Sequence, residues 1–124
     1  MVIACDFDGC ITESNDFPYI NNLKEHSLEA IKNFQAHGHK VILWTCREGK
    51  YLDAAREVLK AYGVELDGYN YSPYQLQSRK IVADVYIDDK NVFMVDNVDW
   101  YKIEEYILGI GNKETKIIKD GYNG

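Results

Sequence analysis

The sequence predicts a single α/β domain built on a parallel β-sheet. Three observations support this prediction: short apolar runs alternate with helical patterns along the chain, the run Lys40–Thr45 has no polar alternation inside it, and two of the runs end at acidic residues. Strands that are buried on both faces of a parallel sheet have such continuous apolar runs. Alternation of strand and helix is typical of a layered α/β fold. A chain of 124 residues is long enough for one domain with its own core.

Three segments are predicted to be strands. They are Val2–Asp6, Lys40–Thr45 and Val82–Ile87, and each is rich in β-branched or aromatic residues. The first ends at an acidic residue, the second at a threonine, and the third is followed by two acidic residues. We expect these three strands to lie in one sheet with the helices packed against it.

Two helices are predicted after the first and second strands. Apolar residues recur at helical spacing from about Ser27 to His37, and again over Tyr51–Tyr62. Gly38 and Gly63 follow directly. Glycine commonly occupies the position just after a helix, so each is expected to end the helix before it.

A last helix is predicted near the C-terminus. Asp99 is a candidate N-cap, and apolar residues continue at helical spacing from Trp100 to an expected end near Gly109 or Gly111. The tail from Asn112 is charged and glycine-rich. Two alternatives remain open for this tail, partial disorder or one additional edge strand.

Two connections are longer than is usual between elements of a compact domain. One is Gly9–Glu25, and the other is the tyrosine-rich segment Val64–Lys80. Long connections of this kind are often functional loops. The stretch Tyr69–Gln77 is therefore expected to lie close to the functional site and to contribute aromatic rings, Tyr74 among them, to substrate binding.

The composition excludes several classes of protein. The chain has 14 Lys and Arg against 20 Asp and Glu, a net charge of −6, and no basic cluster. It therefore lacks a general electrostatic footprint for nucleic acid or for an anionic membrane. No apolar run is long enough to cross a membrane, and the N-terminus does not resemble a signal peptide. Three cysteines without a Cys-x-x-Cys pair favour reduced thiols and a cytoplasmic location.

Residue types suited to binding metal and phosphate gather where the predicted strands end. They are Asp6, Asp8, Thr45, Arg79, Lys80, Asp88 and Asp89. Ligands of parallel α/β sheets bind beyond the carboxyl ends of the strands. Two carboxylates about 4 Å apart repel each other by roughly 4 kcal/mol at an effective dielectric of about 20, and a divalent cation offsets that repulsion. Oxygen ligands without histidine or cysteine favour Mg²⁺.

Four segments, in order, resemble the motifs of the haloacid dehalogenase superfamily of phosphohydrolases. Asp6–Thr12 (DFDGCIT) resembles the first motif, and Leu43–Glu48 (LWTCRE) resembles the second. Lys80 stands where the lysine of the third motif is expected, and Tyr86–Asp89 (YIDD) resembles the acidic fourth motif. The phrases ILWTCRE and SRKIVADVYIDDKN are similar to those of a small capless subgroup. The resemblance implies a Rossmann-like three-layer αβα sandwich without a cap domain.

The resemblance also implies a catalytic role for four residues. Asp6 would attack phosphorus and form an aspartyl-phosphate. Asp8 would protonate the leaving group as general acid and then activate water as general base. Thr45 would donate a hydrogen bond to the phosphoryl group, and Lys80 would neutralise charge between that group and Asp6.

The resemblance further implies a metal site and a phosphate site. The Mg²⁺ ligands would be Asp6, Asp8 through its backbone carbonyl, Asp88, and Asp89 directly or through water. The phosphate site would comprise Phe7, Gly9, Thr45, Cys46, Arg47, Arg79 and Lys80.

The sequence departs from the family pattern in three respects. Cys10 stands where threonine is usual, and we expect it to shape the turn and, like Cys46, to be a packing residue. Arg79 beside Lys80 leaves the cation of the third motif ambiguous by one position. The two points where relatives carry cap domains hold only short segments here, so the site is expected to be open or closed by a second subunit of a homo-oligomer.

The predicted function is therefore that of a Mg²⁺-dependent phosphatase acting on a small or macromolecular phosphomonoester. One alternative is a receiver-like signalling domain, which also combines Mg²⁺ with clustered aspartates. A catalytically silent phosphate-binding domain and a phosphotransferase with the same intermediate are two others.

Overall fold

The computed structural model describes residues 1–72, 83–88 and 98–119, with side chains up to residue 109 in the last segment. The long connection Val64–Lys80 therefore lies partly outside the described residues, and Tyr74 lies wholly outside them. Within the described residues the chain alternates between strands and helices as expected.

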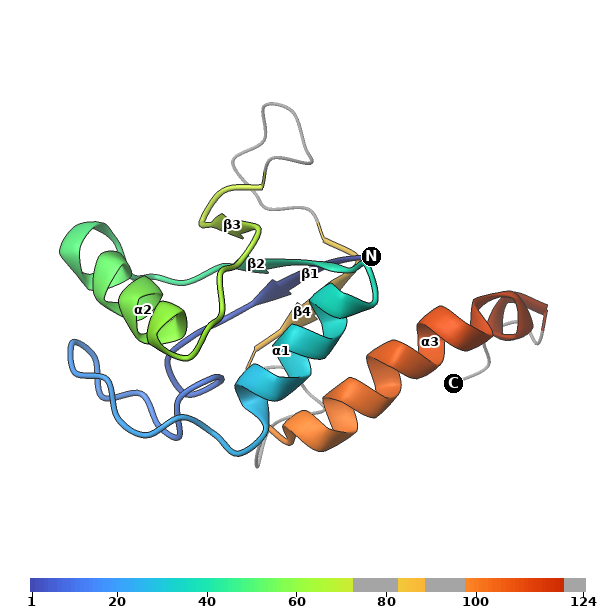
Figure 1. The fold of residues 1–124 in the computed structure, drawn as a ribbon, viewed down its shortest axis with the longest axis horizontal. Coiled ribbons are helices and arrows are strands. Elements are labelled where there is room, and N and C mark those ends of the chain that lie inside the picture. The colour runs from blue at the N-terminus through green and yellow to red at the C-terminus, as the bar shows by residue number, and fades with distance from the viewer. Residues whose placement is uncertain (73–82, 89–97, 120–124) are drawn as a thin grey trace.

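The strands form one four-stranded parallel sheet. They are β1 (Val2–Cys5), β2 (Lys40–Leu43), β3 (Gly68–Tyr69) and β4 (Val85–Ile87), in the order β3-β2-β1-β4 (Figure 1). Every pair is parallel. The predicted α/β class with a parallel sheet is confirmed, and β1 lies inside the sheet between β2 and β4.

Three helices among the described residues connect and flank the strands. They are α1 (Ser27–Ala36), α2 (Gly49–Ala61) and α3 (Trp100–Lys119). Gly38 and Gly63 follow the first two with φ values of 86° and 79°, a left-handed conformation that favours glycine. No helix among the described residues is both long and apolar enough to span a membrane.

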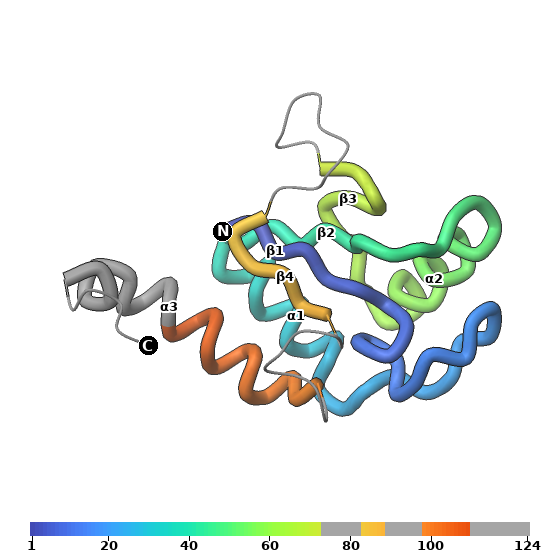
Figure 2. The backbone as a smooth tube through the Cα atoms, turned by 180° about the vertical axis from the view of Figure 1, so that it is seen from behind, coloured from blue at the N-terminus to red at the C-terminus, as the bar shows by residue number. Residues whose placement is uncertain are grey.

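The three described helices pack on the same face of the sheet, so none of them supplies the third layer of the expected αβα sandwich. Their buried side chains, such as Phe34, Leu59 and Ile107, belong to one hydrophobic cluster with Ile3 of β1 and Leu43 of β2. Figure 2, drawn from behind, shows β1 and β4 in front of α1.

The opposite face of the sheet carries a separate hydrophobic cluster. Ala4 and Ile42 form its buried part, and Tyr86 packs against it. No residue of the described helices belongs to this second cluster. The Tyr86 ring also contacts the ring of Trp44, with centroids 5.3 Å apart.

The sequence did not predict β3 as a strand, because the strand is only two residues long and has no apolar run. Gly68 and Tyr69 pair with Ile42 and Leu43 of β2. A Cβ atom on Gly68 would overlap the carbonyl oxygen of Tyr71, so close backbone approach selects glycine at this position.

The last helix is longer than the sequence predicted. It continues through Gly109 and Gly111 to Lys119, so the segment from Asn112 begins as helix rather than as an edge strand. Glycine costs only about 1 kcal/mol inside a helix, and flanking helix-forming residues can offset that cost. At the start of the helix, the Asp99 carboxylate accepts hydrogen bonds from the backbone N–H groups of Tyr101 and Lys102, which confirms the predicted cap.

Candidate active site

Asp6 and Asp88 follow neighbouring strands at the carboxyl edge of the sheet. Cys5 of β1 is in register with Ile87 of β4, and the Asp6 backbone N–H donates to the Ile87 carbonyl over 2.9 Å. The next residue after each strand is therefore an aspartate at the same level of the sheet. Both side chains are half-buried.

The carboxylates of Asp6 and Asp88 also affect the pKa of the neighbouring Cys5 thiol. Burial raises the pKa of the Cys5 thiol well above its ordinary value, the neighbouring Cys10 thiol adds to this rise, and the charges of Asp6 and Asp88 raise it further. A thiol in this setting stays protonated and unreactive. Cys10 is also buried, and its thiol faces the Ile87 carbonyl over 3.6 Å. Its expected packing role is consistent with this position.

A tight turn after β1 presents the residues of the first motif. The Phe7 carbonyl accepts hydrogen bonds from the backbone N–H groups of Cys10, Ile11 and Thr12. Gly9 has φ +77°, and its N–H donates to the Thr12 hydroxyl over 2.9 Å. The turn is thus fixed by its own backbone, and it places Asp8 immediately beyond the sheet edge. Phe7 is fully buried, so any contact it makes with phosphate would come from its backbone.

Thr45 lies on the other side of β1, two residues beyond the end of β2. Its hydroxyl accepts a hydrogen bond from the Arg47 N–H over 3.2 Å. Sequence analysis did not identify the residue that holds this turn, Asn70. The Asn70 amide accepts from the Thr45 N–H over 2.7 Å and donates to the Arg47 carbonyl over 2.9 Å.

Asn70 is suited to this bridging role by its backbone as well as its side chain. Its φ is +56°, a conformation that asparagine tolerates better than most residues. The available sequence signal was an asparagine inside the tyrosine-rich loop, but a two-residue strand next to it gave no indication of its neighbours.

Asp8 forms a buried ion pair with Arg47. The Arg47 Nε atom donates to Asp8 Oδ2 and the Nη2 atom donates to Asp8 Oδ1, both over 2.7 Å. The Arg47 side chain is completely buried, whereas that of Asp8 retains 10% of its exposure. This bidentate geometry is the strongest form of an arginine–carboxylate pair.

The interpretation of Arg47 as a phosphate ligand does not match its position. Its guanidinium also donates to the carbonyl groups of Pro18, Tyr19 and Tyr51 over 3.2–3.4 Å. All three guanidinium nitrogens therefore donate hydrogen bonds within the protein. The group lies under the loop that follows β1 rather than beyond the sheet edge.

The loop that follows β1 is an ordered hairpin. We refer to residues 11–24 as the hairpin loop. Thr12 and Leu23 form an antiparallel bridge, and the Glu13 N–H donates to the Asn22 carbonyl over 2.8 Å. Figures 1 and 2 show this loop beside α2, where the Phe17 ring meets the Tyr51 ring edge-on at 5.1 Å. The expected long connection is therefore a folded element close to Asp8.

Several predicted site residues lie outside the described residues or differ from expectation. Arg79, Lys80 and Asp89 lie outside the described residues. Cys46 was expected to be a packing residue but is exposed. It lies in the turn between Thr45 and Arg47, so its side chain faces away from the core.

The donor set at the sheet edge fits Mg²⁺. Asp6 and Asp88 provide two carboxylates on adjacent strands, and the Asp8 backbone carbonyl lies in the turn between them and the hairpin loop. The described residues contain no group of three or more acidic, histidine or cysteine side chains that could hold a metal. Mg²⁺ does not require one, because it commonly binds one or two carboxylates together with waters and a phosphate. Arg47 binds both oxygens of the Asp8 carboxylate, so the backbone carbonyl is the group of Asp8 that would hold a metal.

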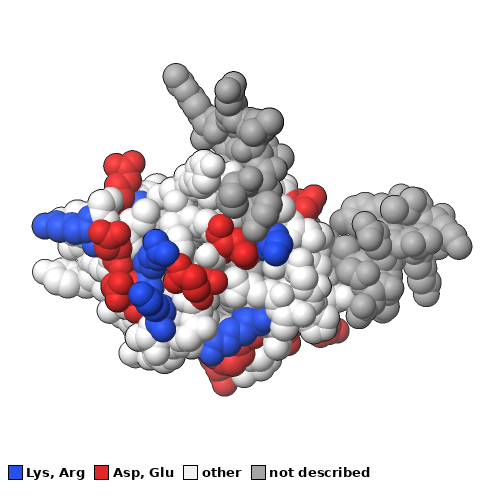
Figure 3. All heavy atoms as spheres, turned by 45° about the horizontal axis from the view of Figure 1, so that its top comes forward, with Lys and Arg blue, Asp and Glu red and all other residues white. Residues whose placement is uncertain are grey.

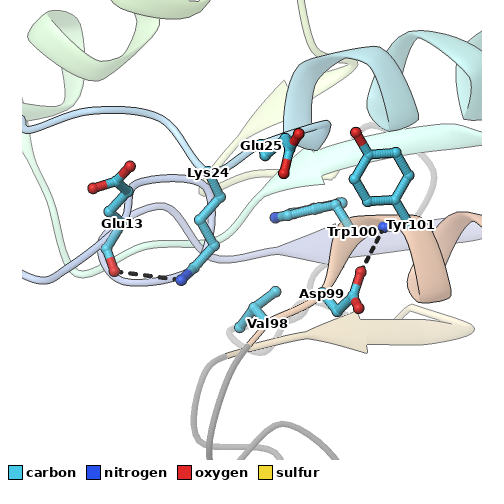
Figure 4. Close-up of a pocket in the computed structure, with 7 residues that line it drawn as sticks. All are labelled: Glu13, Lys24, Glu25, Val98, Asp99, Trp100 and Tyr101. Atoms are coloured by element: carbon cyan, nitrogen blue, oxygen red, sulfur yellow. Dashed lines mark hydrogen bonds between the residues drawn. The ribbon is translucent and has the colours of Figure 1, made fainter.

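A surface pocket of about 290 Å³ lies away from these residues. Figure 4 shows it lined by side chains from the hairpin loop, the segment before α1 and the start of α3, namely Glu13, Lys24, Glu25, Val98, Asp99, Trp100 and Tyr101. The Lys24 ammonium donates to the Glu13 carbonyl, and the Asp99 carboxylate caps α3. These polar groups already have structural partners, and none of the predicted catalytic residues lines the pocket. The sheet edge is the better candidate site.

Charge on the molecular surface is mixed. On the face shown in Figure 3, Lys and Arg side chains are interspersed with Asp and Glu rather than gathered into one basic area. This face would therefore attract a polyanion only weakly at long range.

The fold and the sheet edge together define a parallel α/β protein with aspartates at the carboxyl ends of two neighbouring strands, β1 and β4. No protein-family model and no curated protein matches the chain. Among solved structures, a conserved protein from Bacteroides thetaiotaomicron is similar over 100% of this chain and 98% of its own, with 39% sequence identity and a TM-score of 0.79. The chain belongs to the same family as this conserved protein.

Proposed function

We propose that the protein is a Mg²⁺-dependent phosphomonoester hydrolase of the haloacid dehalogenase type. The observation that carries the proposal is the placement of Asp6 and Asp8 directly after the inner strand β1, with Thr45 beyond β2 on one side and Asp88 beyond β4 on the other. Three adjacent strand ends would thus supply a nucleophile, a proton-transfer group, a hydrogen-bond donor to the phosphate and a metal ligand.

In the first half-reaction, a carboxylate oxygen of Asp6 attacks the phosphorus atom. A bond forms between Asp6 and phosphorus, and the bond between phosphorus and the ester oxygen breaks. The leaving alcohol takes a proton from Asp8, and Asp6 is left as an aspartyl-phosphate. Thr45 donates a hydrogen bond to a phosphoryl oxygen during this transfer.

In the second half-reaction, water attacks the same phosphorus atom from the side of the departed alcohol. Asp8 accepts a proton from that water, the bond between Asp6 and phosphorus breaks, and inorganic phosphate leaves. Asp6 returns to its carboxylate form and Asp8 regains its proton. Asp6, the Asp8 backbone carbonyl and Asp88 would hold Mg²⁺, which supplies positive charge that offsets repulsion between the carboxylates and the phosphate.

The arrangement favours a hydrolase over a receiver-like domain. A receiver-like domain has an acidic pair after its first strand and its phosphoacceptor aspartate after a middle strand. Here the Asp-x-Asp pair with its following glycine comes after β1, and the second acidic pair begins at Asp88, after a strand that neighbours β1. A phosphotransferase would share the intermediate, and it differs only in using an alcohol in place of water.

The proposal is tested with 4-nitrophenyl phosphate and a panel of phosphorylated metabolites, nucleotides and phosphopeptides. We expect hydrolysis that EDTA abolishes and Mg²⁺ restores, and that Ca²⁺ does not support because of its looser coordination. Asp6→Asn should abolish turnover and phosphoenzyme formation. Asp53→Asn, a change to an exposed aspartate of α2, is the matched control and should leave turnover unchanged. Full activity in EDTA, or wild-type turnover in Asp6→Asn, would refute the proposal.

The same panel separates the remaining alternatives. Transfer of phosphate to an added alcohol in preference to water would identify a phosphotransferase. Binding of phosphorylated ligands without turnover would identify a silent binding domain. We place the protein in the cytoplasm, from its three cysteines without a Cys-x-x-Cys pair. We expect a small or macromolecular phosphomonoester as substrate, with closure of the site by a second copy of the chain where the substrate is small.

A further inference from the structure

The Arg47 side chain connects three segments of the chain at one buried point. It pairs with Asp8 in the turn after β1. It also donates to the carbonyl groups of Pro18 and Tyr19 in the hairpin loop and to that of Tyr51 in the first turn of α2. The Asp8 carboxylate is therefore linked through one guanidinium to the two elements that border the site.

Two aromatic rings lie beside the same guanidinium. Its central carbon lies 5.3 Å from the centroid of the Phe7 ring and 5.1 Å from that of the Phe17 ring, within the range of a cation–π contact. With two rings beside it and its N–H groups hydrogen-bonded, the Arg47 guanidinium has very little freedom to move. Its two hydrogen bonds therefore also restrict the orientation of the Asp8 carboxylate.

We infer that Arg47 is a positioning residue that fixes the orientation of the Asp8 carboxylate for proton transfer. The inference rests on the proposed function, in which Asp8 exchanges a proton with the leaving group and with water. Arg47 touches neither of them. It acts through Asp8, and it makes the orientation of Asp8 depend on the docking of the hairpin loop against α2.

The exposed side of the Asp8 carboxylate makes this role compatible with proton transfer. Arg47 occupies one side of the carboxylate, and the Asp8 side chain keeps 10% of its exposure. Each carboxylate oxygen has a second lone pair, so a proton can move at the exposed side while both bonds to Arg47 persist. A displacement of about 1 Å in a catalytic group can cost about 100-fold in rate, which is the advantage of a fixed carboxylate.

An arginine is required for this role rather than any cation. The planar guanidinium offers two parallel N–H bonds that match the two oxygens of a carboxylate, whereas the ammonium of lysine is a single charged point. Arg47→Lys should therefore retain the charge beside Asp8 and lose the fixed orientation. The other described arginine that pairs with a carboxylate, Arg56, contacts Glu65 on the surface, where both side chains are about half exposed. Arg56→Lys is therefore the matched control.

The test separates the two half-reactions with 4-nitrophenyl phosphate. Release of 4-nitrophenol needs no proton donor, because this leaving group is stable as an anion, whereas hydrolysis of the phosphoenzyme needs Asp8 as a base. In Arg47→Lys we expect the burst rate of 4-nitrophenol release to stay within about threefold of wild type. Steady-state turnover should fall by about 100-fold, so the phosphoenzyme accumulates. Hydrolysis of glycerol phosphate, an alkyl ester that needs the acid, should also fall by about 100-fold, and Arg56→Lys should change none of these rates.

A double-mutant cycle with Asp8→Asn shows whether Arg47 acts through Asp8. We expect Arg47→Lys to add less than about twofold to the loss already caused by Asp8→Asn. Multiplicative losses, or a burst rate that falls in parallel with the steady state, would overturn the inference. Arg47→Gln, which keeps an N–H donor, serves as a second variant. Failure of both variants to fold would also overturn the inference, because the ion pair would then be needed for folding rather than for proton transfer. Turnover by the wild type that persists in full in EDTA, or in Asp6→Asn, would refute the proposed function itself.

Discussion

Replacing Asn70 tests whether its side chain holds the Thr45 turn in place. Asn70→Gly removes the hydrogen bond from the Thr45 N–H and the one to the Arg47 carbonyl, while glycine readily adopts the φ of +56° found here. Each such bond contributes about 1 kcal/mol net, so the free energy of unfolding should fall by about 2 kcal/mol.

This loss can be converted into a melting temperature. Unfolding entropies of about 2.1 cal/mol/K per residue give roughly 0.26 kcal/mol/K for a chain of this length. A loss of about 2 kcal/mol therefore lowers Tm by about 8 °C. Because the Thr45 hydroxyl and the neighbouring backbone lose their support, phosphatase turnover should also fall by between about 10-fold and 100-fold.

The measurement is urea and thermal unfolding of Asn70→Gly beside Asn22→Gly, followed by phosphatase assays of both. Asn22 is exposed and its side chain makes no hydrogen bond within the described residues, so Asn22→Gly reports the conformational entropy that a glycine adds to the unfolded chain. A difference of less than about 0.5 kcal/mol between the two variants would refute the reasoning, since two hydrogen bonds should contribute more than that.

Two further predictions concern stability. Trp100→Phe removes the indole N–H that donates to the Cys10 carbonyl over 2.9 Å in the interior and also leaves a small void, so unfolding in urea should show a loss of about 2–4 kcal/mol; an unchanged midpoint would contradict this. Burial lowers the pKa of His39, and the charges of the N-terminal amine and His37 lower it further. Unfolded chains therefore bind the proton more readily than folded ones, and the free energy of unfolding should decrease as the pH falls below about 6.5 and level off below the folded pKa. His39→Gln should flatten this part of the stability profile, and an unaltered slope would show that another group is responsible.

The sequence by itself determined the architecture near β1 and the position of its acidic residues. Continuous apolar runs specify strands that are buried in a parallel sheet, because only such strands need apolar residues on both faces. The acid that ends the run at Asp6 and the one that follows Ile87 then had to lie at the carboxyl edge, since parallel strands end on the same side. Gly38 and Gly63 marked the helix ends for a similarly local reason, the positive φ that each adopts.

Other features depended on contacts between segments that are distant in the chain. Gly109 and Gly111 suggested the end of a helix, yet α3 continues past both, because a glycine only weakens a helix unless the chain must turn there. The pattern also gave no sign that all three helices share one face of the sheet. Which face a helix covers depends on the connection before it and on the packing of its neighbours.

Only the tertiary structure decided the role of Arg47. In the sequence it stands two residues after Thr45 and was predicted to bind phosphate. In the folded protein it is paired with Asp8, 39 residues away in the chain, beneath a hairpin loop that had no recognisable pattern. Asn70 was missed for the same reason. A buried polar side chain takes its partner from whichever segment packs against it, and hydrophobic periodicity specifies the segments but not which of their polar groups will meet.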